Sequence, residues 1–515
     1  MWLNEYETLD DARRGIGGYV DRCHHRPHSG LNYRTPDEVR RTWEDLPRDS
    51  WATLTSAHAD LSPLLLGGIC DHMAVTVDAR ERIESHLWLH ESSRSDLFDR
   101  QMLRVFVHAE GCWLEDTRGD RYFDLCSSMW QASLGHGRTE IVDAYATQAR
   151  KVASAGPIMF TTEAAAELAE RLARVAPGDL SRCFLTSSGS EATEAAIKLA
   201  RQYHRLRGEP HRFKFISRYG SYHGAGVGGT SVSGRRRRDS LYYPLMPGTV
   251  NVEPPTGTND REAAESLRRV IEMEGPETIA AFFGEPVAIT QFAIPDAEYW
   301  PLVREICDDY GILLVVDETL QGCCRTGTWW GIQHWNVVPD VMIVAKSLSG
   351  GYAPVAAMVV REEIYDVFTD DVPSPAVQSY GGHGASAAAA AKALEIYESE
   401  AMDDVAERLG AQLERRLGAY RDHEVVRDLR RLGAWVVLEL RDPVTGESLA
   451  QGLSGKWSVA PELSRALLDV GCCAARMSEG LLHVAPPLVA TEDDVDFVVG
   501  AVGTVLDRVA AARRG

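Results

Sequence analysis

The sequence predicts an α/β fold: a mostly parallel central sheet with helices on both faces, joined to a smaller α+β domain. From about residue 180 to 350, short apolar runs alternate with helical patterns of apolar residues. The runs, among them "FKFIS", "GILLVVDE" and "VMIVAKS", are continuously apolar, as expected for parallel strands buried on both faces. After about residue 385, two helical patterns precede short strands and a last amphipathic helix, which predicts the smaller domain.

Composition excludes several classes of function. The 515 residues carry a formal net charge of −21, which argues against binding to nucleic acid or to an anionic membrane. No apolar run approaches the roughly 18 residues that span a bilayer, and the N-terminus lacks the pattern of a signal peptide. We therefore expect a cytoplasmic protein. The ten cysteines show no CxxC pair, which predicts reduced thiols and no metal site.

The first fifty residues differ in character from the rest. The stretch "RPHSGLNYRTP", from Arg26 to Pro36, resembles the C-terminal end of an insertion-sequence transposase with an integrase core. Strand transfer in that family needs three carboxylates on two metal ions, and the segment that would carry them is missing. We expect residues 1–50 to be an inactive remnant and residues 51–75 to be a linker, with Met73 as a plausible alternative start.

A phosphate-binding turn is suggested by "FLTSSGSEATEAAIKLAR", residues 184–201. An apolar run ends in small hydroxyl residues and a glycine, and a helical pattern of alanines and leucine follows. Backbone N–H groups at the start of a helix carry a partial positive charge and suit a phosphate. Simple capping of the helix by Ser190 explains the pattern equally well.

Two chemically active side chains directly follow apolar strands. Asp317 ends "GILLVVD", at the sheet edge where open α/β folds bind ligands, and a protonated ring nitrogen would offset the cost of burying its charge. A structural salt bridge is the alternative. Lys346, one of only six lysines, follows "VMIVA", and burial favours the neutral amine that forms Schiff bases. A phosphate cradle, an acid and a lysine in this order are the anchors of pyridoxal 5'-phosphate.

Residues from about 80 to 512 resemble the class III aminotransferases, pyridoxal-phosphate enzymes of fold type I, and within them the ω-amino acid:pyruvate transaminases. The matching motifs are "SGSEATEAAIKLAR", "SYHGAG", "GEPV", "RTGTWWG", "PDVMIVAKSLSGGYAP", "SYGG" and "APPLVATEDD". The resemblance implies a large coenzyme-binding domain over 131–385. The smaller domain would combine an N-terminal part, 76–130, with the C-terminal residues 386–515.

The resemblance also implies roles for individual residues. Lys346 would carry the coenzyme as an aldimine and later move the substrate proton, and Asp317 would pair with the ring nitrogen. Tyr222 would stack on the ring, and Glu285 would support the site near Asp317. The phosphate would be held by three consecutive residues: Ser188, Gly189 and Ser190.

Further positions concern the substrate and the oligomeric state. Trp130 matches a pocket-lining aromatic residue of the family, with core packing as the alternative. Arg476 matches a mobile arginine that binds an α-carboxylate, with an ordinary surface arginine as the alternative. Ser379 stands where the family has a threonine that reaches the phosphate of the neighbouring subunit, which implies a homodimer with shared active sites.

The chain departs from the family pattern at several points. Thr319 stands where the family places valine or isoleucine against the ring face, and "GCCRTG" replaces "GFGRTG". The arginine run from Arg235 to Arg238 is expected to be a solvated loop, with guidance of an acidic substrate as the alternative.

The predicted reaction is ping-pong transamination. An amine or amino acid would donate its amino group, and a keto acid such as pyruvate or 2-oxoglutarate would accept it. Racemisation, aminomutation or decarboxylation on the same scaffold is the alternative, and a non-catalytic binding role is a further one.

Overall fold

The computed structural model describes residues 79–90, 92, 95, 97, 101–235, 239–368, 372–449, 460–474 and 480–514. The transposase-like segment 1–50, the linker 51–75 and Arg476 lie outside the described residues. The chain divides into two units, 1–88 and 89–515. Among the described residues, the first unit contains a helix over 79–86. The sheets and the named helices all belong to the second unit.

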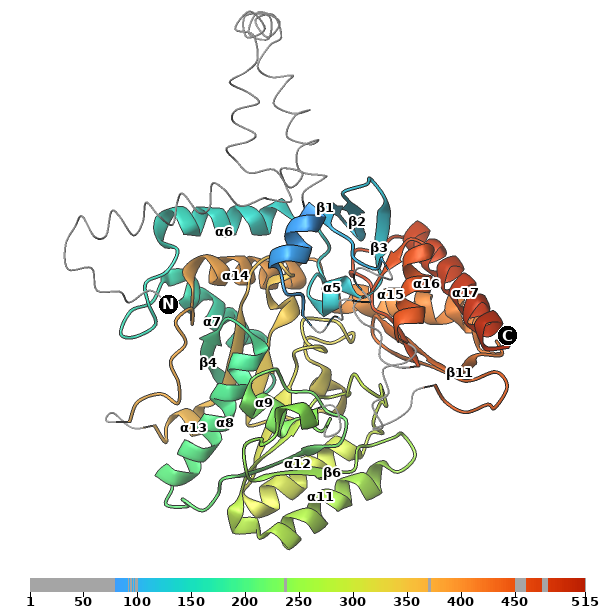
Figure 1. Cartoon of the computed structure of the whole chain (residues 1–515). Helices are drawn as coiled ribbons and strands as arrows, with labels where there is room; N and C mark the ends of the chain where they lie inside the picture. The colour runs from blue at the N-terminus through green and yellow to red at the C-terminus, as the bar shows by residue number, and fades with distance from the viewer. Residues whose placement is uncertain are drawn as a thin grey trace, which may run out of the picture. The chain divides into compact units, whose positions relative to one another are not determined.

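A seven-stranded sheet forms the centre of the second unit (Figure 1). All its strands run parallel except β10, which is antiparallel to both of its neighbours. This confirms the predicted mostly parallel α/β fold. In spatial order the strands are β4 (Leu180–Thr186), β10 (Ala356–Arg361), β9 (Val341–Val344), β8 (Leu313–Asp317), β7 (Ile279–Gly284), β5 (Lys214–Arg218) and β6 (Thr249–Val252).

Apolar side chains cover both faces of this sheet. In β8, Leu314 and Val316 join one buried cluster, whereas Val315 between them joins a second cluster on the opposite face. Alternation of side chains across a strand produces this division. The second cluster is completed by alanines and leucine of α8 (Gly189–Leu206). The first is completed by helices that include α7 (Glu163–Val175), α11 (Asp260–Glu274), α12 (Tyr299–Tyr310) and α14 (Gly384–Ser399).

The helices of this part vary in length. Helix α14 packs along α6 and α7, and the three are seen together in Figure 1. The α-helices are α5 (Ser127–Trp130), α6 (Thr139–Val152), α7 (Glu163–Val175), α8 (Gly189–Leu206), α9 (Val227–Val232), α11 (Asp260–Glu274), α12 (Tyr299–Tyr310), α13 (Glu362–Tyr365) and α14 (Gly384–Ser399). Short 3₁₀ helices are η3 (Ser240–Tyr242), η4 (Pro276–Thr278), η5 (Gly331–Trp335), η6 (Lys346–Ser349) and η7 (Gly418–Tyr420).

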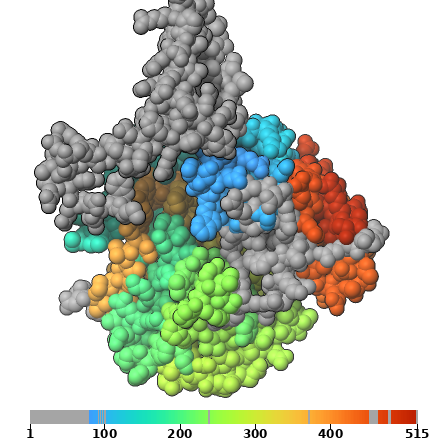
Figure 2. Space-filling view, in the orientation of Figure 1, coloured from blue at the N-terminus to red at the C-terminus, as the bar shows by residue number. Residues whose placement is uncertain are grey.

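The C-terminal residues form an α+β arrangement. An antiparallel sheet of β11 (Val426–Leu432), β12 (Trp435–Leu440) and β14 (Leu481–Val484) is accompanied by α15 (Met402–Leu417), α16 (Ala460–Asp469) and α17 (Glu492–Arg514). The C-terminal helices, red in Figure 2, lie at one edge of the visible face. This confirms the smaller α+β region, whereas the predicted domain boundaries stay predictions.

Strands from opposite ends of the unit share a third sheet. Its members are β1 (Phe106–Glu110), β2 (Trp113–Asp116), β3 (Arg121–Asp124) and β13 (Cys472–Cys473), and β13 pairs with β3. Every cysteine in the described part is a free thiol, as predicted. No helix within the described ranges has the length and apolar character needed to cross a membrane.

The turn from Ser127 to Trp130, which contains α5, has an unusual backbone. All four of its residues have positive φ angles, between 46° and 66°. The side chains of L-amino acids make this left-handed backbone region energetically costly. The turn therefore needs stabilising contacts from other parts of the chain. Asp124 supplies part of it by accepting hydrogen bonds from the backbone N–H and the hydroxyl of Ser128, at 2.7 and 2.8 Å.

Arg325 supplies the rest and joins distant parts of the chain. Its fully buried guanidinium donates to the hydroxyls of Ser127 and Ser133, both at 2.9 Å, and to the carbonyls of Ala434 and Pro486. Burial lowers the pKa of Arg325 to about 10, so the group remains a cation at neutral pH. One side chain therefore fastens the 127–133 turn to the start of β12 and to the segment after β14.

Replacing Arg325 with methionine should lower the free energy of unfolding by about 3 kcal/mol, because several buried acceptors lose their donor. Thermal or urea unfolding measures the loss. Arg261→Met is the matched control, since the exposed ion pair of Arg261 with Glu298 is worth less than about 1 kcal/mol. Equal stability of Arg325→Met and the wild type would show that burying the cation costs as much as its bonds return.

Candidate active site

The site lies where the parallel strands of the large sheet end. Strands β4, β5, β7, β8 and β9 run in the same direction, so their C-terminal ends meet at one edge. Ligands of open α/β sheets bind at this edge. Most of the residues predicted from the sequence belong to the turns that follow these strands.

Helix α8 begins in the turn after β4. Ser188 is its N-cap, and the hydroxyl oxygen of Ser188 accepts a hydrogen bond from the N–H of Glu191 at 3.2 Å. The alternative in which Ser190 caps the helix is therefore wrong: the hydroxyl of Ser190 instead accepts from the N–H of Ala225 at 3.0 Å. The bond leaves Ser190 facing the turn after β5.

Gly189 lies where three segments of the chain converge. A β-carbon at this position would lie 3.3 Å from the side chains of both Ala345 and Thr319, which is closer than ordinary contacts. Glycine thus lets the first turn of α8 approach the ends of β8 and β9. Thr319 and Ala345, the residue before Lys346, lie next to the helix N-terminus, and the phosphate-binding role of this turn stays a prediction.

Asp317 is buried and held by a histidine. The Nδ1 atom of His223 lies 3.0 Å from Oδ2 of Asp317, and the N–H of Thr319 donates to Oδ1 at 3.1 Å. Burial alone raises the pKa of Asp317, but the hydrogen bond and charge of His223, with help from Thr319, bring it below its usual value. Asp317 is thereby stabilised as a carboxylate inside the protein.

Sequence reasoning missed His223. The residue directly follows Tyr222 in "SYHGAG", so a polar neighbour of a predicted site residue was the available signal. Its Nε2 atom is buried and has no hydrogen-bond partner in the described part of the chain.

The neighbouring acid, Glu318, points elsewhere. Its two carboxylate oxygens accept from the N–H groups of Gly331 and Ile332, each at 2.8 Å, at the start of η5. Burial raises the pKa of Glu318 to about 8, while these two bonds oppose the shift. Glu318 therefore anchors a loop, and Asp317 alone of the pair faces the site.

Glu285, directly after β7, is the second buried acid of the site. Arg218 donates a hydrogen bond to its backbone carbonyl, and the guanidinium lies 4.0 Å from its carboxylate. Burial raises the pKa of Glu285. Neither carboxylate oxygen has a hydrogen-bond partner among the described residues, and buried polar atoms of this kind call for a polar ligand or water.

Lys346 begins η6, directly after β9. Its backbone lies in the left-handed region, with φ 48°. Burial lowers the pKa of Lys346, and the charges of Asp317 and Glu285 oppose that shift. The next residue fixes the turn: the hydroxyl of Ser347 lies 2.7 Å from that of Ser133 and donates to the carbonyl of Trp130, also at 2.7 Å.

Tyr222 lies in the turn after β5, against Arg235. The guanidinium carbon of Arg235 is 4.2 Å from the centre of the Tyr222 ring. The side chain of Arg235 is only partly exposed, so the interpretation as a solvated loop is wrong for this residue. Arg236, Arg237 and Arg238 lie outside the described residues.

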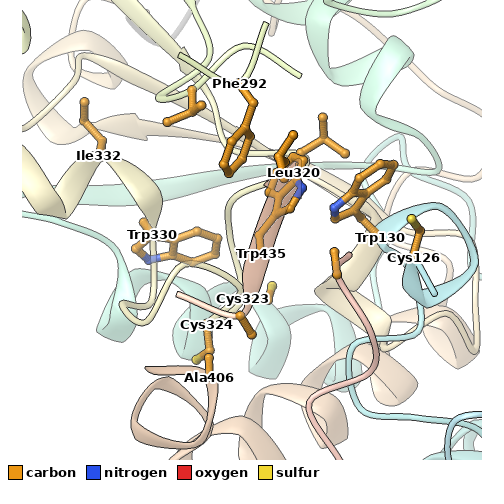
Figure 3. Packing of buried hydrophobic residues seen from close by; sticks show 14 of the residues in the cluster. Cys126, Trp130, Phe292, Leu320, Cys323, Cys324, Trp330, Ile332, Ala406 and Trp435 are labelled. Carbon is orange, nitrogen blue, oxygen red and sulfur yellow. The ribbon is translucent and has the colours of Figure 1, made fainter. Parts of the chain in front are cut away.

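Trp130 is buried in an aromatic group with Phe292 and Trp435 (Figure 3). Its ring also contacts that of His483. The ring centres of Trp130 and Trp435 are 5.0 Å apart. Core packing is therefore part of its role. The indole Nε1, however, is buried and has no hydrogen-bond partner in the described ranges, so a pocket-lining role stays a prediction.

Ser379 lies exposed in a turn before α14. Its predicted contact with the phosphate of a second subunit stays a prediction. The described residues contain no group of three or more histidine, cysteine, aspartate or glutamate side chains that could hold a metal ion.

These residues fit pyridoxal 5'-phosphate. The α8 N-terminus offers N–H groups and small residues for a phosphate, Asp317 offers a charged carboxylate for a protonated ring nitrogen, and Lys346 offers an amine with a lowered pKa. The unpartnered atoms of Glu285 and His223 offer further polar contacts.

Comparison with known proteins places this geometry in a family. The model of the family "Aminotransferase class-III" matches residues 96–506. A probable aminotransferase of Mycobacterium tuberculosis is 34% identical over 82% of this chain and 92% of its own length. The β-alanine–pyruvate aminotransferase of Pseudomonas aeruginosa is 31% identical, over 79% of this chain and 92% of its own length.

A solved structure agrees. A transaminase from the marine bacterium Virgibacillus superimposes with a TM-score of 0.78 at 33% identity, over 85% of this chain and 99% of that chain. Sequence family, relatives and fold coincide over the same residues. The chain therefore belongs to the class III aminotransferases, the enzymes that transfer amino groups with pyridoxal 5'-phosphate.

Proposed function

We propose that this chain transfers the amino group of an ω-amino acid or other primary amine to pyruvate or a similar keto acid, with Lys346 as the residue that carries the coenzyme. The convergence of Lys346, Asp317 and the α8 N-terminus at one sheet edge carries the proposal. Similarity to the β-alanine–pyruvate aminotransferase of Pseudomonas aeruginosa supports the choice of substrates.

Lys346 has two tasks in this proposal. As a neutral amine it would hold the coenzyme through its aldehyde, and as a free amine it would take up and return the proton of the substrate carbon. Its lowered pKa favours both tasks, because a protonated amine can neither attack a carbonyl nor accept a proton. The bonds of Ser347 to Ser133 and Trp130 hold the turn that presents the amine.

Asp317 acts through its charge. When bound, the coenzyme supplies an aldehyde and a protonated ring that withdraws electrons from the substrate carbon. Asp317 would keep the ring nitrogen protonated, and a carboxylate already fixed by the protein would need no reorganisation to do so. His223 and Thr319 orient this carboxylate. Tyr222 covers the ring, and Glu285 contributes an acceptor beside it.

The first turn of α8 holds the phosphate. Ser188, Gly189 and Ser190 provide the backbone N–H groups and hydroxyls, and the helix dipole favours the phosphate charge. Thr319, next to Gly189, takes the place of the family's valine or isoleucine against the ring.

A homodimer is part of the proposal. Exposed apolar side chains occur on neighbouring segments: Val152 at the end of α6, Ile158 and Phe160 after it, and Tyr380 next to Ser379. The backbone bond from Ala385 to Ala153 brings these segments together. Apolar patches of this kind favour association between subunits, which would carry Ser379 to the partner's phosphate. Arg476 would bind the substrate carboxylate, and the cytoplasmic location also stays a prediction.

Changing Lys346 to alanine should abolish covalent retention of the coenzyme and reduce amino transfer to the background rate. Absorbance spectra of the purified protein and keto-acid consumption measure the two effects. Lys198→Ala, which removes an exposed lysine of α8, should behave as wild type. Amino transfer that survives in Lys346→Ala, or turnover of an amine without consumption of keto acid, would contradict the proposal.

Changing Asp317 to asparagine should lower kcat by roughly 10²–10³, because a preorganised charge is lost from the site. Lys346 should still bind the coenzyme, so the absorbance of the bound coenzyme separates loss of chemistry from loss of binding. Asp308→Asn removes an exposed acid of α12 that pairs with Arg304 and serves as the control. A kcat within a few fold of wild type would remove Asp317 from its proposed role.

Coenzyme capture by the apoprotein should increase with pH and reach half of its maximal rate below the usual lysine pKa of about 10.4. The sign follows from burial: it disfavours the ammonium form of Lys346, so the reactive neutral amine forms at lower pH than in a free lysine. Borohydride reduction followed by mass spectrometry measures capture, with Lys346→Ala as the blank. A midpoint at or above the free-lysine value contradicts this expectation.

A further inference from the structure

Arg235 places a positive charge beside the site that none of the roles above uses. Its guanidinium lies over the ring of Tyr222, with the guanidinium carbon 4.2 Å from the ring centre. Such a contact stabilises the cation and orients it. Tyr222, on which the Arg235 guanidinium stacks, is also the tyrosine that is proposed to cover the coenzyme.

Among the described residues, no acid forms an ion pair with this cation. Burial, the largest influence, lowers the pKa of Arg235, while Asp239 and Glu285 raise it through their charges. In the described part of the chain, neither Asp239 nor Glu285 forms an ion pair with Arg235. The guanidinium that pairs with the Glu285 carboxylate is that of Arg218. The Nε atom of Arg235 is buried without a hydrogen-bond partner there. Desolvated cations normally have an anionic partner, so this guanidinium has donors to offer to one.

The acids of the site influence both Arg235 and Lys346. Asp317 acts electrostatically on Tyr222, and Glu285 acts on Arg235. Asp317 and Glu285 both act on Lys346, whereas Arg235 is not among the charges that influence it. Arg235 therefore lies near Glu285, an acid of the site, without being among the charges that act on Lys346.

We propose that Arg235 is a specificity residue that binds an acid group carried by the substrate at a distance from its reacting carbon. The planar guanidinium matches a carboxylate or sulfonate with two parallel hydrogen bonds. The substrate class is then ω-amino acids as donors and dicarboxylic keto acids as acceptors. This proposal rests on the aminotransferase function proposed above, and it assigns to Arg235 a task separate from that of Arg476.

Two measurements on the coenzyme-loaded full chain test the proposal. The first is calorimetric binding of glutarate, a dicarboxylate that cannot react. The second is bleaching of the coenzyme absorbance by 6-aminohexanoate and by hexylamine, which differ in the distant acid group. Arg235→Gln removes the charge, and Arg235→Lys keeps it but removes the planar fork. Arg207→Gln is the matched control, because Arg207 also stacks on a tyrosine, Tyr203, at the far end of α8.

Arg235→Gln should weaken glutarate binding and lower the preference for 6-aminohexanoate over hexylamine, each by about tenfold or more, as expected for a lost hydrogen bond to a charged group. Arg235→Lys should give glutarate affinity and amine preference between those of Arg235→Gln and the wild type. Arg207→Gln should match the wild type in both. The proposal is overturned if the wild type does not bind glutarate, if Arg235→Gln binds it equally well, or if both amines lose reactivity in parallel. Failure of every amine to bleach a loaded protein that still binds glutarate through Arg235 would instead reject the aminotransferase function.

Discussion

The buried guanidinium of Arg325 links the fold to the site. It donates to Ser133, whose hydroxyl meets that of Ser347, and Ser347 in turn donates to the carbonyl of Trp130. Lys346 precedes Ser347, so the position of the lysine amine depends on a cation in a different loop. The same guanidinium binds carbonyls beside β12 and β14. Burying this charge is costly, and the cost is offset only while every one of these partners is in place.

Two adjacent acids at the end of β8 show how the surroundings of a side chain determine its chemistry. Asp317 faces His223 and has a lowered pKa, whereas Glu318 faces the start of η5 and has a raised one. Both are buried and both end the same apolar strand. The difference arises from partners that lie far away in the sequence. A site built this way can keep one carboxylate charged for catalysis and use the other to hold the surrounding loop.

The sequence predicted the features that have a local signal. Continuous apolar runs predicted β8 and β9, and Lys346 and Asp317 were predicted as site residues because a charged residue directly after such a run is unusual. β6 is short and polar, and the alanines of β10 suit a helix as well as a strand, so neither strand was expected. His223 and the stacked position of Arg235 were missed because burial by partners distant in the chain leaves no periodic pattern. Neighbouring serines are equivalent in sequence, and only the backbone distinguishes Ser188 as the cap.

The turn that carries Trp130 has a consequence for altering the enzyme. Its four left-handed residues are held by Asp124 and Arg325 rather than by the indole itself. Trimming the indole would thus open space beside Phe292 and Trp435 without releasing the backbone beneath it. A glycine in place of the exposed Met129 would relieve torsional cost at the same time, so this one loop tolerates change at two neighbouring positions while its anchors stay in place.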